Sequence, residues 1–378
     1  MKTLYMHIGT PKTGTSAIQY FCCQNYDVLL KRGLCYPDLG FSFPGIGSNR
    51  NAHFLSHRMF DEQNQRLPEE EKKIREQGLA KLENLFARRD CVVISDEHIW
   101  NEKEINKECL ENIRERMEAI GVTVRVIVYL RRQEQVIQSY WAQQVKEGLQ
   151  LSFSEYMEKG RYRYFQLNYE KRLKVFSDVL GKENVIVRCY EKGQYLGKEQ
   201  TIISDFLHIF GIELNDELRE SNLVKNPSLQ GIYLQVKCLL NANPAFSTKR
   251  NFSVSLLQKV QQAEEDGVVF TQGDGLSKQE VEEYLSKFIE KNEAVARTYL
   301  GREDGMLFYD PISQSEEKVV YKEGDMVAIC GKVIALQEQE IKKLKRKLER
   351  NTLRGKAKRI YHKLKDRGEE KNAPEAQE

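Results

Sequence analysis

A short turn near the N-terminus carries the residues best suited to chemistry. An apolar run of strand length, Leu4–Ile8, precedes it, and apolar residues at helical spacing follow it. The turn itself reads Pro11, Lys12, Thr13, Gly14, Thr15 and Ser16. A glycine-bearing turn between a strand and a helix exposes backbone N–H groups at the positive end of the helix dipole. The sequence therefore predicts a binding site for phosphate or sulfate.

The position of the lysine separates two kinds of anion site. The frame from Gly9 to Gly14 has the length of a Walker A loop, GxxxxGK[ST]. Thr15 stands where that pattern needs lysine, and Lys12 lies inside the turn instead. This departure argues against an ordinary nucleoside triphosphatase. The plain alternative is a turn with a solvent-exposed lysine.

A second pair of polar residues agrees with an anion site. Arg131 stands at the end of the expected strand Val122–Leu130, and Ser139 follows eight residues later in the next helix. A guanidinium group is a forked, charged clamp for phosphate, and a serine hydroxyl adds a further donor. The alternative is that Arg131 pairs with a surface acid.

Together these motifs resemble the sulfotransferases that use 3′-phosphoadenosine 5′-phosphosulfate (PAPS), whose loop pattern is PKxGT[ST]. Segments 226–229 (NPSL) and 292–308 also look like bacterial members of that family. The resemblance implies that Lys12 lies at the bridging oxygen between phosphate and sulfate. It implies that the N–H groups from Thr13 to Ser16 bind the 5′-phosphate, that Arg131 and Ser139 hold the 3′-phosphate, and that no metal is required.

The resemblance also calls for a base after the second or third strand. His53 is the first candidate and Glu97 the second, and the adjacent His98 also stays open. Heparan-type members carry a glutamate before an HFF-like string, and here Asn51 and Ala52 take its place. The alternatives are a loop histidine that caps a helix, for His53, and an N-cap or first-turn acid of the next helix, for Glu97. His53 and His57 lack a third ligand in the sequence, so we predict no metal site.

The order of elements predicts an α/β fold with a central parallel sheet flanked by helices, as in P-loop-like proteins. Further strands are expected at 34–36, 91–95, 122–130 and 184–190. Helices are expected from Thr15 to Arg32, stopped by Gly33, and at 67–90, 102–120, 133–146, 169–180, 201–210, 229–240, 254–265 and 278–299. The predicted domain covers residues 1–312, and a linker covers 313–325.

The C-terminal part differs in composition from this body. Val327, Ile334, Ile341 and Leu348 recur every seventh residue, an imperfect heptad pattern typical of coiled coils. Residues 342–367 hold thirteen Lys and Arg against two acids, whereas the whole chain has a net charge of +3. We expect a basic amphipathic or coiled-coil helix at 326–367 and a disordered acidic tail at 368–378. This helix could bind a partner helix, anionic lipid or nucleic acid, or could simply be solvated.

Eight cysteines without a CxxC pair suggest reduced thiols, and the start of the chain does not read as a signal peptide. We therefore expect a cytoplasmic, bacterial protein, peripheral at the inner membrane face if the basic helix binds lipid. No nucleic-acid partner is expected.

The sequence as a whole predicts sulfuryl transfer from PAPS to a hydroxyl or amine of an acceptor, and analogy favours a carbohydrate or glycolipid. One rival is a P-loop ATPase or kinase, because CVVISDE resembles a Walker B strand. The other is a non-catalytic scaffold with a nucleotide-binding fold.

Overall fold

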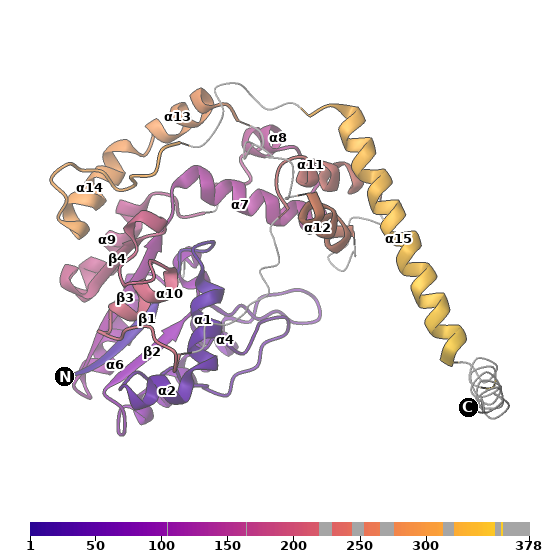
Figure 1. Ribbon diagram of the computed structural model, residues 1–378. Coiled ribbons are helices and arrows are strands. Elements are labelled where there is room, and N and C mark those ends of the chain that lie inside the picture. The colour runs from indigo at the N-terminus through magenta and orange to yellow at the C-terminus, as the bar shows by residue number, and fades with distance from the viewer. Residues whose placement is uncertain are drawn as a thin grey trace, which may run out of the picture. The chain divides into compact units, whose positions relative to one another are not determined.

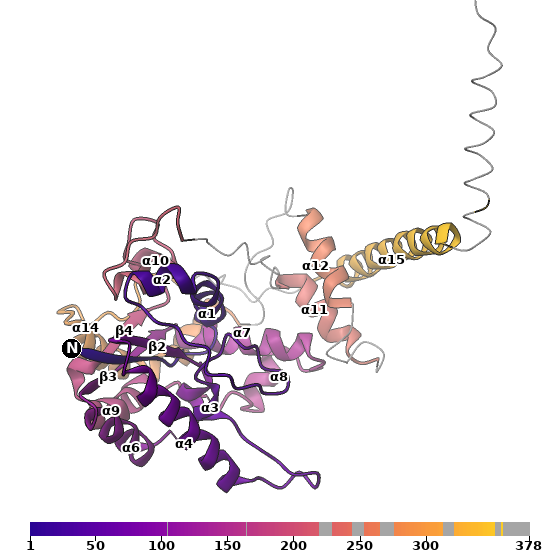
Figure 2. The ribbon, with the colours of Figure 1, turned by 90° about the horizontal axis from the view of Figure 1, so that it is seen from below.

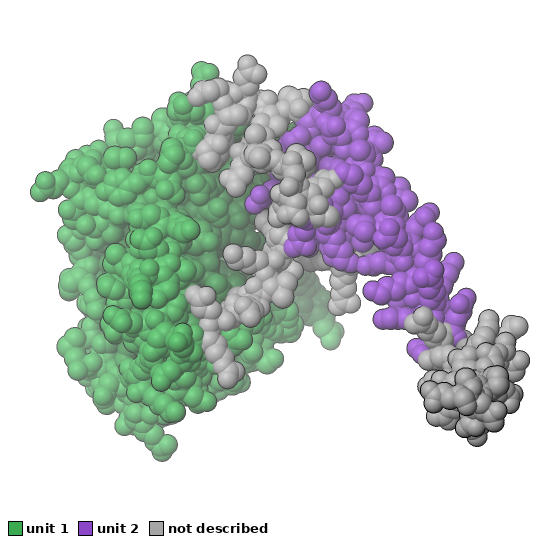
Figure 3. All heavy atoms as spheres, in the orientation of Figure 1, with its two compact units in different colours: residues 1–144, 151–226, 272–319 green, residues 145–150, 227–271, 320–378 purple. Residues whose placement is uncertain are grey.

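The computed structural model describes residues 1–103, 105–163, 165–218, 229–243, 253–264, 276–312, 321–351 and 357. It divides the chain into two compact units, one of residues 1–144, 151–226 and 272–319 and one of residues 145–150, 227–271 and 320–378 (Figure 3). The sequence-based boundaries differ, because they assigned 227–271 to the first domain. Much of the predicted linker and the acidic tail at 368–378 lie outside the described residues.

A four-stranded parallel sheet forms the centre of the first unit (Figure 1). Its strands are β1 (Lys2–His7), β2 (Cys91–Ser95), β3 (Val122–Leu130) and β4 (Val185–Cys189), in the order β2-β1-β3-β4. Leu4 of β1 pairs with Val92 of β2 and Val124 of β3, and all three side chains are buried. Apolar residues on both faces of a strand are typical of a parallel sheet covered on both sides. The predicted fold class is confirmed.

Helices cover both faces of this sheet. Those of the first unit are α1 (Thr15–Gln24), α2 (Tyr26–Lys31), α3 (His53–Ser56), α4 (Pro68–Leu85), α5 (His98–Asn101), α6 (Lys107–Glu118), α7 (Gln133–Lys146, whose last two residues belong to the second unit), α8 (Phe153–Glu158), α9 (Tyr169–Leu180), α10 (Ile202–His208), α13 (Lys278–Ser286) and α14 (Ile289–Leu300). Figure 2 shows the sheet between α1, α2 and α10 on one side and α4, α6 and α9 on the other. Two separate apolar cores result, one containing Phe21, Ile127 and Phe206 and the other containing Leu4 and Val126.

Two helices predicted as continuous are each divided in the structure, so these predictions were wrong in their bounds. At Asn25, between α1 and α2, the side-chain amide donates to the carbonyl of Phe21 at 2.9 Å. At Ser286, the last residue of α13, the hydroxyl donates to the carbonyl of Glu283 at 2.7 Å. Such local side-chain bonds compete with helix continuation. The strand predicted at 34–36 is also absent as a strand: Cys35 forms only an isolated bridge to Val92.

The second unit is helical in its described part. It contains α11 (Gly231–Leu240), α12 (Ser253–Glu264) and α15 (Glu323–Asn351), which pack against one another. The amide of Asn241 donates to the carbonyls of Val145 and Leu149, at 2.7 and 2.8 Å, and so fixes the end of α11. Among the described residues, no helix is long and apolar enough to cross a membrane. Residues 226–228 of the NPSL segment and the basic stretch after Asn351, apart from Ala357, lie outside the description.

The packing of α4 predicts a measurable stability change. A Cβ added at Gly78 would lie 2.2 Å from Cδ2 of the buried Phe54. Gly78→Ala gains about 1 kcal/mol of helix propensity. Overpacking costs about 1–3 kcal/mol, and more for so close a contact. We expect a net loss of about 1 kcal/mol or more in denaturant unfolding. The control is Gly331→Ala in α15, which has open space around it and should be neutral or stabilising; an equal loss in both variants would contradict the packing argument.

Candidate functional site

The loop after β1 continues the pairing of that strand with β3. The N–H of Thr10 donates to the carbonyl of Tyr129 at 2.8 Å, and the N–H of Tyr129 donates to the carbonyl of Gly9 at 2.7 Å. Gly9 has φ 103°, and a Cβ there would lie 3.2 Å from Cα of Glu97. The position therefore favours glycine for both reasons. The absence of a side chain at Gly9 lets the loop lie directly against the residues that follow β2.

The turn itself has the geometry of an anion cradle. Lys12 (φ 69°) and Gly14 (φ 74°) adopt the left-handed conformation, and α1 begins at Thr15 without a side-chain cap. Within the described part of the chain, the backbone N–H groups of 13–16 have no hydrogen-bond acceptor. Successive unpaired N–H groups at a helix N-terminus favour a bound anion. The predicted strand, turn and helix are present in that order.

The side chain of Lys12 lies against α7. Its ammonium group donates a hydrogen bond to Oε1 of Gln143 and lies 5.5 Å from the centre of the Tyr140 ring. Both partners follow Ser139 by one to four residues, so the ammonium lies on the part of α7 that carries the predicted phosphate-binding serine. The sequence identified Lys12 but gave no indication of Gln143 or Tyr140.

Arg131 joins the two predicted motifs. Its Nη1 donates to the backbone carbonyl of Lys12 at 3.0 Å, and its Nε donates to Oε1 of Gln135 at 3.1 Å. Its guanidinium carbon lies 5.5 Å from the centre of the Tyr190 ring. Burial lowers the pKa of the Arg131 guanidinium. The group nevertheless stays charged at neutral pH, because the usual pKa of arginine lies far above neutral. The alternative pairing with a surface acid is not found among the described residues.

Ser139 lies about two turns into α7, as predicted from its spacing to Arg131. Its side chain is half-buried, and its hydroxyl has no hydrogen-bond partner in the described ranges. The donor is therefore available to an incoming group. Its role in binding phosphate stays a prediction.

A second cluster of polar side chains surrounds Asp96, the first residue after β2. One carboxylate oxygen lies 2.6 Å from Nδ1 of His53. The other accepts from Nη2 of Arg50 and from the backbone N–H of His98, each at 2.7 Å. Burial raises the pKa of the Asp96 carboxyl, but the hydrogen bond from His53 and the charge of Arg50 outweigh it. The net pKa lies below the usual value, so Asp96 is ionised at neutral pH.

The ionised state of the Asp96 carboxylate determines which ring nitrogen of His53 carries the proton. An ionised carboxylate can only accept hydrogen bonds, so Nδ1 of His53 carries the proton that faces it. Nε2 is then the basic nitrogen, and it lies 3.3 Å from Nδ1 of His57. Burial and the neighbouring His53 lower the pKa of His57. His53 is itself buried, with 4 % of its surface exposed.

The structure brings together the three candidate bases that the sequence left open. Glu97 accepts from the amide of Gln19 at 3.3 Å and lies 3.6 Å from Nη1 of Arg50. His98 is exposed, and its backbone N–H donates a hydrogen bond to the carboxylate of Asp96. His53, Glu97 and His98 thus all surround Asp96 and Arg50. The sequence considered Asp96 only as part of a Walker B strand, and it gave no signal for Arg50.

The cluster also places a carboxylate and a second histidine beside His53, although His57 does not belong to this group. Ligand atoms of His53, Asp96 and His98 lie within 4.8 Å of one another. These side-chain types suit a transition metal. However, the guanidinium of Arg50 already neutralises Asp96, and its positive charge opposes a cation at the same oxygens. The donor set fits a hydrogen-bonded histidine–carboxylate pair better than a metal centre.

Both clusters follow the carboxyl ends of neighbouring strands. The Lys12 turn follows β1, Asp96 follows β2 and Arg131 follows β3. Ligands of open parallel sheets bind at this edge. The close approach of Gly9 to Glu97 shows that the loop leading into the anion cradle lies against the Asp96 cluster.

Comparisons with known proteins give limited similarity. No family model matches the chain. An uncharacterized protein from Archaeoglobus fulgidus is 26% identical over 204 residues, which cover 54% of this chain and 52% of that protein, so the chain spans about half the length of the curated relative it matches. A sulfotransferase from Alicyclobacillus acidocaldarius aligns in structure with a TM-score of 0.32 and 17% identity, over 59% of this chain and 90% of that one. These values assign no family, and the functional argument rests on the site itself.

Proposed function

We propose that the protein is a sulfotransferase that moves a sulfuryl group from PAPS to a hydroxyl or amine of an acceptor. The observation that carries this proposal is the hydrogen bond from Arg131 to the carbonyl of Lys12. It holds two cationic side chains from distant parts of the sequence at one turn with unpaired N–H groups. A nucleotide with phosphate groups at both its 3′ and 5′ positions has the complementary charge.

The donors in this site match the parts of such a nucleotide. When bound, PAPS supplies the sulfuryl group and a bisphosphate leaving group. The N–H groups of 13–16 bind the 5′-phosphate, and Arg131 with Ser139 binds the 3′-phosphate. The ammonium of Lys12 neutralises the charge that develops on the departing oxygen. Its bond to Gln143 holds it near Ser139 until the donor is present.

The acceptor must lose a proton as its oxygen attacks sulfur. The new S–O bond forms to the acceptor, and the bond from sulfur to the bridging phosphate oxygen breaks. Nε2 of His53 takes the acceptor proton, because Nδ1 is committed to Asp96. Asp96 is a positioning residue that stabilises the protonated imidazole, and Arg50 keeps Asp96 ionised. Glu97 stays a second candidate base, and it lies 3.6 Å from Nη1 of Arg50.

A carbohydrate or glycolipid is the acceptor class we favour, by analogy with heparan-type and bacterial sulfotransferases. The rival ATPase or kinase activity would need Mg²⁺ at Asp96. Arg50 and His53 occupy both oxygens of that carboxylate, so the metal would have to displace them. A non-catalytic scaffold would have no need for the unpaired N–H groups and cations of the turn.

Calorimetric titration with adenosine 3′,5′-bisphosphate tests the proposal directly. Binding should be unaffected by a chelator and tighter than binding of Mg²⁺–ATP. A screen of glycan and small-alcohol acceptors with a labelled sulfate donor should then identify a sulfated product. Tight, metal-dependent ATP binding without adenosine bisphosphate binding would support the kinase-type alternative and overturn the proposal.

We expect substitution of Arg131 to weaken the binding of nucleotides that carry a 3′-phosphate. A hydrogen bond to a charged group contributes about 1.5–3 kcal/mol, so Arg131→Ala should weaken adenosine 3′,5′-bisphosphate binding about 10- to 100-fold. Binding of adenosine 5′-monophosphate, which lacks the 3′-phosphate, should change much less. Calorimetry of both ligands checks this. An equal loss for both would mean that Arg131 only supports the Lys12 carbonyl and does not contact the nucleotide.

A further inference from the structure

The long helix α15 has two apolar faces. The first packs within the second unit: Ile329 and Val333 are buried, with 4 and 8 % of their surface exposed, where α15 meets α11 and α12. Lys259 of α12 forms an ion pair with Glu340 on the edge of this face. This packing accounts for one side of the helix only.

The second apolar face, which we call the seam, is exposed. Its large side chains keep 49–69 % of their surface exposed, and they are Val327, Ile334, Ile341, Leu344 and Leu348. Four of them recur at intervals of seven and occupy position a of a heptad abcdefg. Position d holds Cys330, Gln337 and Leu344, and Asn351 would follow. An apolar a/d pattern of this kind is suited to another helix.

We propose that the seam binds the seam of a second copy of this chain, as a parallel two-stranded coiled coil. The inference does not depend on the proposed sulfotransferase activity. Identical faces that meet about a twofold axis bury both seams at once and leave no exposed apolar stripe. Beta-branched residues at three of the four a positions favour two strands.

Charges beside the seam favour the second copy and the parallel direction. Glu340 occupies position g, and Lys345 occupies position e of the next heptad. In a parallel dimer these positions face each other across the interface, so the dimer has two Glu340–Lys345 pairs. In an antiparallel dimer, g faces g and e faces e, and this pairing is lost. The in-chain ion pair of Glu340 leaves about half of both side chains exposed.

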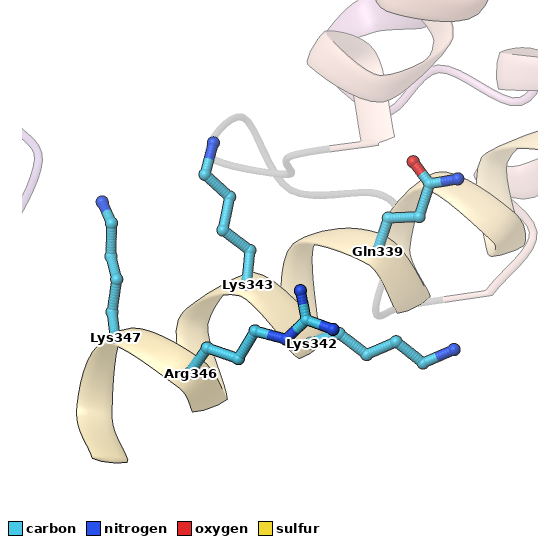
Figure 4. Close-up of a pocket in the computed structure, with 5 residues that line it drawn as sticks. All are labelled: Gln339, Lys342, Lys343, Arg346 and Lys347. Carbon is cyan, nitrogen blue, oxygen red and sulfur yellow. The ribbon is translucent and has the colours of Figure 1, made fainter. Parts of the chain in front are cut away.

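Three basic residues lie away from the seam, whereas Lys345 at position e and Lys347 at position g flank it. Figure 4 shows Lys342, Lys343 and Arg346 of α15 as extended side chains; they occupy positions b, c and f, on the outer side of a coiled coil. A lipid surface fits the seam less well. The described seam has no aromatic side chain, and the acidic Glu338 and Glu340 flank its middle, where anionic lipid would repel them.

The oligomeric state of the full-length protein tests the proposal. By sedimentation velocity at about 10 μM, the wild type should be a dimer. Ile341→Glu places a charge in the seam and should raise the dimer dissociation constant about 100-fold or more. Ile341 is half-exposed in the single chain, so its replacement should leave the fold intact. The matched control is Arg346→Glu on the outer side, which should stay dimeric. A monomeric wild type, or equal effects of the two variants, overturns the proposal.

Two further measurements test the direction of the helices. Glu340→Lys should raise the dissociation constant about tenfold, and the added Lys345→Glu should restore it. Cys330 at position d should lie opposite its partner copy, so mild oxidation should link two chains, and Cys330→Ser should prevent this. Failure of both rescue and cross-linking contradicts the parallel arrangement. Retention on anionic vesicles that Arg346→Glu abolishes, with the protein monomeric in solution, would show a lipid-binding helix instead.

Discussion

Lys12→Ala is expected to lower kcat for sulfuryl transfer about 100- to 1,000-fold while the protein keeps its fold. The ammonium acts mainly when negative charge develops on the departing oxygen, and removal of one such group typically costs this much. Affinity for the product adenosine 3′,5′-bisphosphate should fall less, because the N–H groups of 13–16 and Arg131 remain. Steady-state kinetics with labelled donor, together with calorimetry of the product, separate the two effects.

The choice of alanine keeps the backbone of the turn comparable. Lys12 has φ 69°, a conformation that costs alanine about as much as lysine, whereas glycine would relax it. Gln143→Ala is the control, because Gln143 holds the ammonium without providing the charge. It should change kcat less than tenfold. If the Lys12→Ala enzyme keeps more than a tenth of the wild-type kcat, the ammonium group of Lys12 does not stabilise the departing oxygen and the proposed role is wrong.

Local patterns were sufficient to predict the sheet and the helices nearest to it. The strand bounds of β2 and β3 and the helix bounds of α7 and α9 agree with those predicted from the sequence. Each is a continuous apolar or amphipathic run, so its period is unambiguous. The interruptions at Asn25 and Ser286 were missed because the apolar period continues across both, and a side-chain hydrogen bond to the preceding turn leaves no mark on that period.

The site shows the same division between local and distant contacts. The turn around Lys12 was found because its residues are consecutive. Arg50 was missed, and Asp96 was considered only as a Walker B acid, because the role of both depends on a contact between residues 46 positions apart. Asp96 had one available signal, an acid at the carboxyl end of a buried strand beside β1. The exposed seam was predicted from its heptad spacing, and the structure adds which face of α15 is already covered.

His53 and Asp96 lead to a prediction about pH dependence. His53→Ala should lower kcat/KM about 100- to 10,000-fold, since it removes the general base. Asp96→Asn keeps the size of the side chain but removes its charge, so the protonated imidazole is less stabilised. The acid limb of the kcat/KM profile should then move to lower pH, with a lower plateau because the tautomer of His53 is no longer fixed. A profile from pH 5 to 9 for the three proteins checks both effects.

Stability measurements separate this role from a structural one. The pKa of Asp96 is lowered in the folded protein, so its carboxylate stabilises the fold at neutral pH, and this stabilisation is lost as pH falls through the folded pKa. Asp96→Asn should therefore lower stability at pH 7 and leave Arg50 with only its longer ion pair to Glu97, which a structural role alone also predicts. Only a role in proton transfer also moves the acid limb. If Glu97→Gln abolishes turnover while His53→Ala does not, Glu97 is the base, and His53 has a structural role beside Asp96.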